Sequence, residues 1–224
     1  MHSYEIEIKS LLGSSEHAEK LRQKMKEVDS QTALLSRHKQ LNHYFTAGDV
    51  KKLAPLVAQK LSKKNRKELQ TMIEKGSEFS VRTREADGDV LLVVKASIDE
   101  GTSSNTVSRI EFEAPVPITL DALDRLVLDA GFSYQAKWSR EREEYVCKGA
   151  HVCIDRNAGY GYVAEFEKVI DNETDTKRAK EELHRLMKLL NAEELPQDRL
   201  ERMFAHYNAH WQEYYGTDKV FVIK

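Results

Sequence analysis

Charged and apolar residues alternate strictly near the start of the chain, in Glu5-Ile6-Glu7-Ile8-Lys9. A period of two is the pattern of a β-strand, on which the three charged residues share one face and the two isoleucines share the other. The same pattern is typical of the solvent-exposed face of an ordinary antiparallel sheet. The stretch therefore predicts a strand and leaves the purpose of its charges open.

Pairs of like charges at alternate positions recur four more times along the chain. The pairs are Arg82 with Arg84, Glu111 with Glu113, Arg140 with Arg142, and Glu165 with Glu167. Like charges that lie side by side in a sheet repel each other, so stability alone does not favour this arrangement. Acidic and basic strands are both present, and a bound polyanion with metal ions would balance them. The recurrence therefore favours a binding role for the charged faces.

The predicted strands are mostly consecutive and antiparallel, and helices fill the ends and the connections. We expect strands at about 4–9, 32–46, 79–85, 90–97, around 111–113, and at 133–147, 152–155 and 162–170. Helical spacing follows Ser14, fills an insertion at about 50–77, runs from Thr119 or Asp121 to Gly131, and returns at about 173–215. The tail at 220–223 is expected as a short strand or a docked arm.

These elements predict an α+β fold in a single domain that spans residues 1–224. About eight strands with charge on one face and apolar residues on the other favour a closed, mostly antiparallel β-barrel surrounded by helices. The interior of such a barrel would be charged. Buried charges need partners, so the interior would require a ligand, ions or water.

Composition excludes several other classes of protein. The chain has 224 residues and a formal net charge of -2, so no basic field draws it to nucleic acid, and we expect no nucleic-acid partner. No apolar run reaches the length of a bilayer-spanning helix, and the first residues lack a signal-peptide core. We therefore expect a cytoplasmic protein without a membrane partner. Cys147 and Cys153 could form a disulfide, but reduced thiols suit that compartment better. The oligomeric state is not indicated.

Taken in order, the motifs resemble the signature of the CYTH superfamily, the triphosphate tunnel metalloenzymes. The resemblance covers residues 4 to about 168 and begins with the Glu-x-Glu-x-Lys strand. The motifs that follow are Tyr44-Phe45, Arg82-x-Arg84, Lys95, Glu111-x-Glu113, a basic pair before Tyr145, Asp155 and Glu165-x-Glu167. This family implies an eight-stranded antiparallel tunnel that binds a triphosphate end-on together with divalent metal.

The members of this family imply several activities. They include inorganic triphosphatases, thiamine triphosphatases, class IV adenylate cyclases and some RNA triphosphatases. We expect metal-dependent hydrolysis of inorganic triphosphate or of a small organic triphosphate, such as thiamine triphosphate or a nucleotide. The alternatives are an adenylate cyclase that makes cyclic AMP from ATP, and a non-catalytic polyphosphate-binding module. Hydrolysis of a triphosphate needs no recognition of a base, and no adenine-reading motif is visible in the sequence.

Chemistry and resemblance together divide the charged residues by role. Mg²⁺ or Mn²⁺, the expected cofactor, prefers oxygen ligands, and the metal candidates are Glu5, Glu7, Glu111, Glu113, Asp155, Glu165 and Glu167. Phosphate oxygens prefer Lys and Arg, which assigns to them Lys9, Arg82, Arg84, Lys95, Arg140 and Arg142. The resemblance also implies catalytic roles for Lys9 and Tyr44. Asp155 could instead cap a turn, and Tyr44 could be a packed strand aromatic.

Three features depart from the family pattern, and one is the turn after Phe45, which reads Thr46-Ala47-Gly48-Asp49 and lacks the proline that many members carry. The basic pair reads Arg140-x-Arg142 where Lys-x-Arg is usual, and Lys137 could compete for the role. The insertion at about 50–77 is long and rich in lysine. It could act as a lid or a funnel for anions. It could also be a helical hairpin on the surface that only packs outside the barrel.

Overall fold

The computed structural model describes residues 4–97, 109–170 and 172–223. By contacts the chain divides into two compact units, residues 1–39 with 139–224 and residues 40–138. We call these the first unit and the second unit. Two long strands, β2 (Ala33–Ala47) and β6 (Phe132–Cys147), contribute residues to both units.

The described residues form an α+β fold with eight antiparallel strands in one sheet and six α-helices. The strand order is β1-β8-β7-β6-β2-β3-β4-β5. Among the strands that the structure describes, this order begins at β1 and ends at β5 without returning. The antiparallel α+β sheet is thus confirmed, whereas its expected closure into a barrel is considered below as part of the proposed function.

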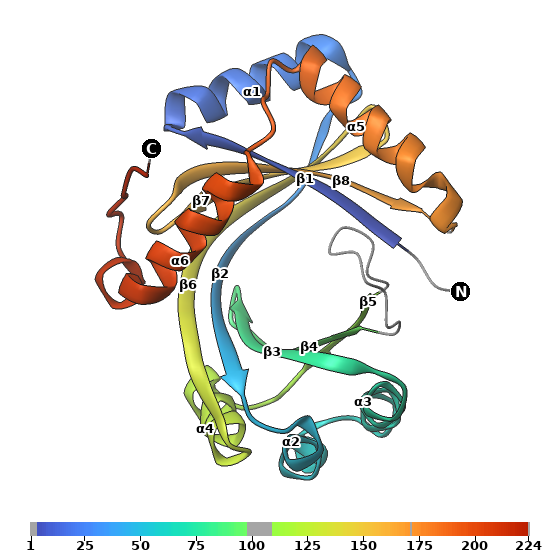
Figure 1. Ribbon diagram of the computed structural model, residues 1–224, viewed down its shortest axis with the longest axis vertical. Coiled ribbons are helices and arrows are strands. Elements are labelled where there is room, and N and C mark those ends of the chain that lie inside the picture. The colour runs from blue at the N-terminus through green and yellow to red at the C-terminus, as the bar shows by residue number, and fades with distance from the viewer. Residues whose placement is uncertain (1–3, 98–108, 171, 224) are drawn as a thin grey trace. The chain divides into compact units, whose positions relative to one another are not determined.

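In the first unit, helices cover the apolar face of the strands. The strands β1 (Tyr4–Gly13), β7 (Ala150–Asn157) and β8 (Gly161–Ile170) pair with one another and with β6. The helices α1 (Ser15–Val28) and α5 (Thr176–Leu189) lie together over β1 and β8 (Figure 1). Their core includes Ile8, Leu21, Met25, Val152, Ile154, Phe166, Leu183 and Leu186. The opposite face of these strands is left for charged residues.

The last helix and the tail pack around Gly159. The helix α6 (Gln197–Tyr214) begins after Pro196, and its Tyr207 lies against Tyr160 with ring centroids 5.5 Å apart. The backbone N–H of Phe221 donates to the carbonyl of Gly159 at 2.8 Å, beside a single bridge between Gly159 and Val220. The tail is therefore a docked arm, held by backbone hydrogen bonds to Gly159 and by a hydrogen bond from Arg199 to the carbonyl of Ile223.

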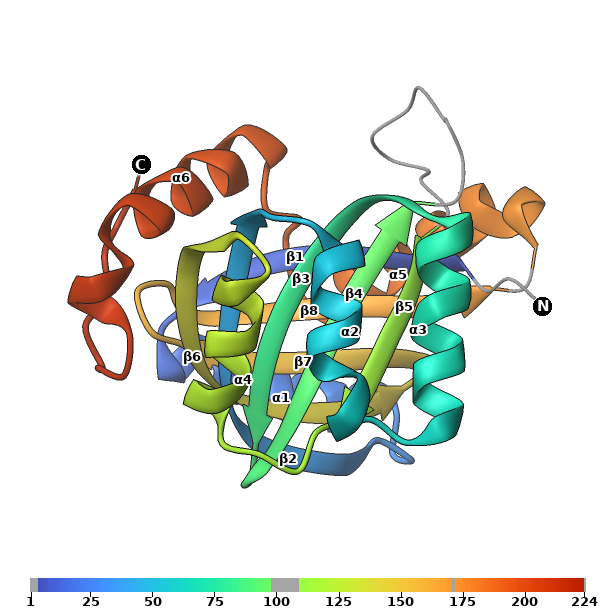
Figure 2. The same cartoon turned by 90° about the horizontal axis from the view of Figure 1, so that it is seen from below.

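In the second unit, helices again cover one face of the sheet. The strands are β3 (Ser77–Ala86), β4 (Asp89–Ser97) and β5 (Arg109–Pro115) with the adjoining part of β2. The helices α2 (Val50–Val57) and α3 (Lys63–Lys75) flank a short 3-10 turn, and in Figure 2 α2 lies in front of β4 while α3 lies beside β5. With α4 (Leu120–Asp129) they enclose a core that includes Leu53, Val57, Leu69, Met72, Val81, Leu92, Val94, Phe112, Leu123 and Val127.

Helix starts follow the expected capping chemistry. The side chain of Ser14 accepts a hydrogen bond from the backbone of His17 at the start of α1. Thr119 accepts one from the backbone of Ala122 at the start of α4. Both satisfy amide groups that a helix leaves unpaired. No helix in the described part of the chain is both long and apolar enough to cross a bilayer.

Candidate functional site

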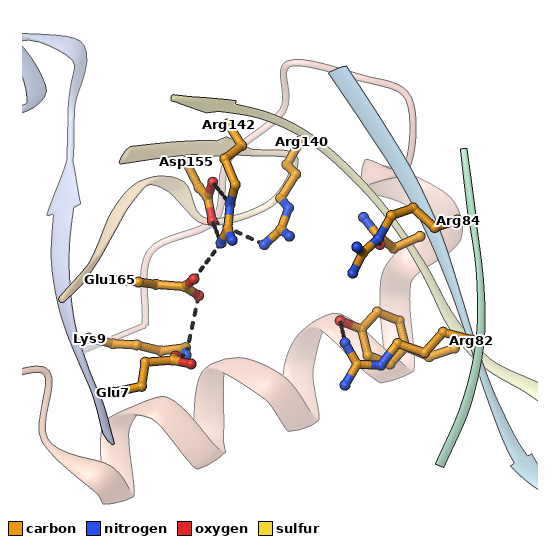
Figure 3. A network of polar contacts seen from close by, with 10 residues as sticks. Glu7, Lys9, Arg82, Arg84, Arg140, Arg142, Asp155 and Glu165 are labelled. Carbon is orange, nitrogen blue, oxygen red and sulfur yellow. Dashed lines mark hydrogen bonds and ion pairs between the residues drawn. The ribbon is translucent and has the colours of Figure 1, made fainter. Parts of the chain in front are cut away.

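A continuous chain of ion pairs lies on the charged face of the first unit (Figure 3). Lys9 Nζ lies 3.2 Å from Glu165 Oε1, and Arg142 Nη2 bonds Glu165 Oε2. Arg142 also holds Asp155 with two nitrogens, Nε at 2.8 Å and Nη2 at 2.6 Å. Arg140 Nη1 donates to the same carboxylate at 3.1 Å. Two carboxylates therefore fix the directions of three cations.

Strand register brings these partners together from distant parts of the chain. Lys9 lies directly opposite Glu165 in the β1–β8 pair, and Arg142 lies directly opposite Asp155 in the β6–β7 pair. Directly opposed residues in an antiparallel pair have side chains on the same face, within reach of each other. Because Asp155 lies inside β7 and is only 1% exposed, it is a buried strand residue and not a turn cap.

The neighbouring charges shift the pKa values of Glu165 and Arg142 toward their charged forms. Burial alone would raise the pKa of Glu165, but the charges of Lys9, Arg142 and Arg140 lower it to about 2. Burial disfavours the Arg142 cation, yet the hydrogen bonds and charge of Asp155 raise the pKa of Arg142 above its ordinary value. Both effects follow from opposite charges held close together away from water.

Two carboxylates face each other at the other end of this face. Glu7 on β1 lies directly opposite Glu167 on β8, which in turn lies opposite His151 on β7. Glu7 also forms an ion pair with Lys9. Glu5 lies in β1 opposite Val169, and its side chain lies outside the described residues.

The second unit presents its own set of paired charges. Arg84 Nε donates to Asn42 Oδ1 at 2.8 Å, and Arg84 Nη1 lies 2.9 Å from Glu113 Oε2. Lys95 Nζ lies 2.8 Å from Glu111 Oε2, and these two residues are directly opposite in the β4–β5 pair. Each of the two basic residues is thus held by a carboxylate from β5.

Tyr44 contacts Arg82 in two ways. Its hydroxyl lies 3.4 Å from Arg82 Nη1, and the Arg82 guanidinium carbon lies 4.7 Å from the centre of its ring. The ring also packs edge-on against Trp138 at 6.2 Å. Tyr44 is therefore both a packed aromatic and a direct neighbour of a basic residue. Arg82 Nε is buried and finds no hydrogen-bond partner among the residues that the structure describes.

The basic insertion lies behind the charged face of its unit. Val81 and Thr83 alternate with Arg82 and Arg84 along β3, and Val81 packs in the core under α2 and α3. The two helices therefore cover the face of β3 that is opposite to the arginines. Lys137 also lies on that side, with its ammonium 3.8 Å from Asp124 of α4.

The carboxylates of the site come in pairs. Within the described residues, no group of three or more His, Cys, Asp or Glu side chains gathers closely enough to hold a metal ion by itself. The two cysteines are both buried free thiols. Cys147 lies in the core under α1, and Cys153 lies opposite Glu144 and Glu165 on the charged face.

Several residues of these networks were not singled out from the sequence. Asn42 lies two positions before Tyr44 on the same strand face, which is the one signal that could have indicated it. A buried cluster around Asp124, which includes His43 and Thr83, left no comparable signal.

The chain also matches a known family. The profile of the CYTH domain matches residues 70–199, more than half of the chain. The chain belongs to the CYTH family. No curated protein matches this CYTH chain.

Solved structures share its fold. A conserved hypothetical protein of Pyrococcus furiosus is 18% identical with a TM-score of 0.58, over 87% of this chain and 93% of that chain. A candidate adenylate cyclase of Vibrio parahaemolyticus is 16% identical with a TM-score of 0.56, over 92% of this chain and 99% of that chain. The adenylyl cyclase candidate HpAC1 of Hippeastrum, described as having a dominant triphosphatase activity, is 18% identical with a TM-score of 0.50, over 91% and 96%. At these identities the likeness concerns the fold alone.

Proposed function

We propose that this CYTH protein hydrolyses a triphosphate with the help of a divalent metal ion. The substrate would be inorganic triphosphate or a small organic triphosphate, such as thiamine triphosphate or a nucleotide. One observation carries the proposal. Each unit presents basic side chains that are held by carboxylates on other strands of the same unit, as in the Arg142–Asp155 and Arg84–Glu113 contacts.

The basic residues suit the oxygens of a phosphate chain. Arginine offers a planar fork of donors that can bind two phosphate oxygens, and lysine offers a compact positive charge. The proposed phosphate ligands are Lys9, Arg82, Arg84, Lys95, Arg140 and Arg142. The buried Arg82 Nε supports this role, because an unsatisfied buried donor is costly unless a ligand meets it.

The carboxylates suit a hard divalent metal ion. Mg²⁺ usually takes one or two carboxylates and fills its remaining positions with water and substrate phosphates. The Glu7–Glu167 pair and the closely spaced Glu111 and Glu113 fit this pattern without a cluster of three. Glu5, Asp155 and Glu165 stay in the proposed set of metal ligands, although Asp155 also orients two arginines. When bound, Mg²⁺ or Mn²⁺ would neutralise phosphate charge and orient water.

Lys9 and Tyr44 are the proposed catalytic residues. Phosphoryl transfer needs little covalent help from the protein, so positioning and charge stabilisation supply most of the rate. Lys9 can donate to a phosphoryl oxygen on which charge develops, and the Tyr44 hydroxyl can help to orient the attacking water. The closed eight-stranded tunnel expected from the sequence is part of this proposal.

Adenylate cyclase activity is the second candidate. It is favoured by the description of the Vibrio parahaemolyticus relative as a candidate adenylate cyclase. In that reaction the ribose 3′-hydroxyl of ATP replaces water, with the same metals and basic residues. Hydrolysis ranks first because HpAC1 is described as having dominant triphosphatase activity.

A single incubation experiment separates these activities. Purified protein is supplied with inorganic triphosphate, ATP or thiamine triphosphate, each with Mg²⁺ or Mn²⁺, and phosphate, pyrophosphate and cyclic AMP are measured. We expect phosphate release from at least one substrate and its loss in Arg84→Ala and Arg142→Ala. Cyclic AMP as the main product would establish the cyclase instead. No product from any substrate, together with binding of inorganic triphosphate measured by calorimetry, would establish a binding module.

A further inference from the structure

A polar cluster is buried in the core of the second unit, behind the charged face. Asp124 of α4 is 1% exposed, and its carboxylate lies 3.8 Å from the Lys137 ammonium and makes three hydrogen bonds. His43 Nδ1 lies 2.7 Å from Oδ2, the Thr83 hydroxyl donates to Oδ1 at 2.5 Å, and the Tyr134 hydroxyl donates to Oδ2 at 2.6 Å. His43 and Thr83 are 2% and 0% exposed. The cluster therefore ties α4 to β2, β3 and β6.

The cluster occupies a position in the core where apolar side chains could pack instead. Leu123 and Val127 of the same helix are fully buried in the surrounding core. Burial alone would raise the pKa of Asp124, but the hydrogen bonds from His43, Thr83 and Tyr134 lower it below its ordinary value. A buried carboxylate with full hydrogen bonding adds little net stability, because well-packed apolar residues could replace it at little cost. Its main effect is to fix the orientation of the groups that it contacts.

The position of the cluster in the register suggests what this orientation serves. His43 and Thr83 lie directly opposite each other in the β2–β3 pair. The pairs on either side, Asn42 with Arg84 and Tyr44 with Arg82, alternate with them and so present their side chains on the other face of the sheet. Asp124 thus holds both strands from behind at the point between the two arginines.

Both arginines contact residues of β2, and Arg84 is also held by Glu113 of β5. Arg84 Nε bonds Asn42 at 2.8 Å, and Arg82 lies over the Tyr44 ring at 4.7 Å. Any change in how β2 lies against β3 therefore changes where the two guanidinium groups point. Misplacement of a binding group by about 1 Å can reduce an enzyme's rate about 100-fold.

We propose that Asp124 is a positioning residue for the triphosphate site, which acts through Thr83 and His43 to fix the directions of Arg82 and Arg84. The inference rests on the proposed function and assigns part of it to a residue on the far face of the sheet. Asp124 does not touch substrate in this proposal.

The sharpest test is a pair of substitutions at Thr83. Thr83→Val keeps the shape and removes the hydroxyl that donates to Asp124, whereas Thr83→Ser keeps the hydroxyl. KM and kcat are measured with inorganic triphosphate and Mg²⁺. We expect Thr83→Val to raise KM on the order of fivefold or more with a smaller change in kcat, and Thr83→Ser to restore the parent values. Equal values for Thr83→Val and the parent would overturn the proposal.

A second comparison separates positioning from loss of stability. Asp124→Asn is matched with Val127→Ala, which opens a cavity on the same helix and removes none of the hydrogen bonds of the cluster. Thermal unfolding and the NMR signals of the arginine Nε–H groups are recorded without substrate. We expect the Arg84 signal to shift or broaden in Asp124→Asn and to stay in place in Val127→Ala. An unmoved signal would refute positioning even if the parent protein proves to bind no triphosphate, whereas a parent without activity but with a moved signal would refute only the proposed function.

Discussion

Glu7 on β1 and Glu167 on β8 lie directly opposite each other in the register of this antiparallel pair. Like charges in this position destabilise a sheet, by an amount similar to what an opposite-charge pair contributes. Lys9 offsets part of this repulsion through its ion pair with Glu7, and a bound cation between the two carboxylates would offset the rest.

The first prediction concerns this pair. Glu167→Gln removes the repulsion, so the protein without metal should be unchanged in stability or more stable by about 0.5 kcal/mol. The same variant should lose most of its turnover with Mg²⁺ or Mn²⁺. Thermal unfolding and phosphate release measure the two effects. The matched control is Glu27→Gln on the exposed side of α1, which should change neither. Normal turnover in Glu167→Gln would remove this residue from the metal site.

The second prediction concerns the Arg142 fork. Arg142→Lys keeps the charge but cannot reproduce the two parallel bonds to Asp155, so we expect a loss of about 1–3 kcal/mol in the free energy of unfolding. Turnover should fall as well. Urea unfolding gives the first quantity. Arg156→Lys is the control, because Arg156 pairs with exposed Asp218 and should matter little.

The third prediction is a pH dependence that comes from Glu165. Its pKa is about 2 in the folded protein, below the ordinary value of 4.5, so the unfolded chain takes up the proton first. The resulting stability, roughly 3 kcal/mol, is present above pH 4.5 and is lost as the pH falls toward 2. Unfolding free energies of the parent and of Glu165→Gln should therefore converge over this interval. A constant difference between them would show that Glu165 is not the titrating group.

The fourth prediction addresses the second unit. Arg84→Ala and Lys95→Ala should each weaken binding of inorganic triphosphate by about 2–5 kcal/mol, the range for truncating one partner of a desolvated charge pair. Asn42→Ala should weaken it less, since the Arg84 charge remains while one of its contacts is lost. Steady-state kinetics with Mg²⁺ provide the measurement, and Arg125→Ala on the exposed side of α4 is the control. Unchanged KM and kcat in both variants would place Arg84 and Lys95 outside the site.

The fifth prediction concerns the insertion. Since α2 and α3 pack behind the charged face of β3, we expect the basic residues on them to act as a solvated surface rather than as a lid. Replacing Lys60, Lys63, Lys64 and Lys67 with Ser should leave the association rate of the substrate and its salt dependence nearly unchanged. Stopped-flow measurements at low and high ionic strength test this. A large fall in the rate at low salt would restore the funnel.

Residue alternation predicted the strands well because a period of two reports directly which face each side chain takes. The strand expected at 152–155 extends over Ala150–Asn157, and the strand expected at 79–85 begins at Ser77. Alternation also indicated the paired charges of the proposed site, whereas Lys95 and Asp155 were assigned from the resemblance to the family. Alternation does not report whether a sheet closes on itself. The pattern could therefore not support the predicted closure into a barrel.

The partners within the site could not be predicted from local sequence. Lys9 meets Glu165 only because of the register between the first and last strands. Asp124 looks like an exposed helix residue in sequence, because Asp121, Arg125 and Asp129 are charged around it. Its burial depends on how α4 packs on β2 and β3, and that is a tertiary property that no window of sequence contains.

The ion pairs of the charged faces have a consequence for selectivity. Lys9, Lys95, Arg84 and the Arg140–Arg142 pair each have a carboxylate of this protein as a counter-ion. An anion that binds here competes with that counter-ion for the same cation and weakens the ion pair of the carboxylate. Chloride or sulfate brings nothing to neutralise the released carboxylate, whereas a triphosphate that arrives as its metal chelate supplies the missing positive charge. The proposed site would then bind a triphosphate together with its metal ion in preference to an anion that brings no cation.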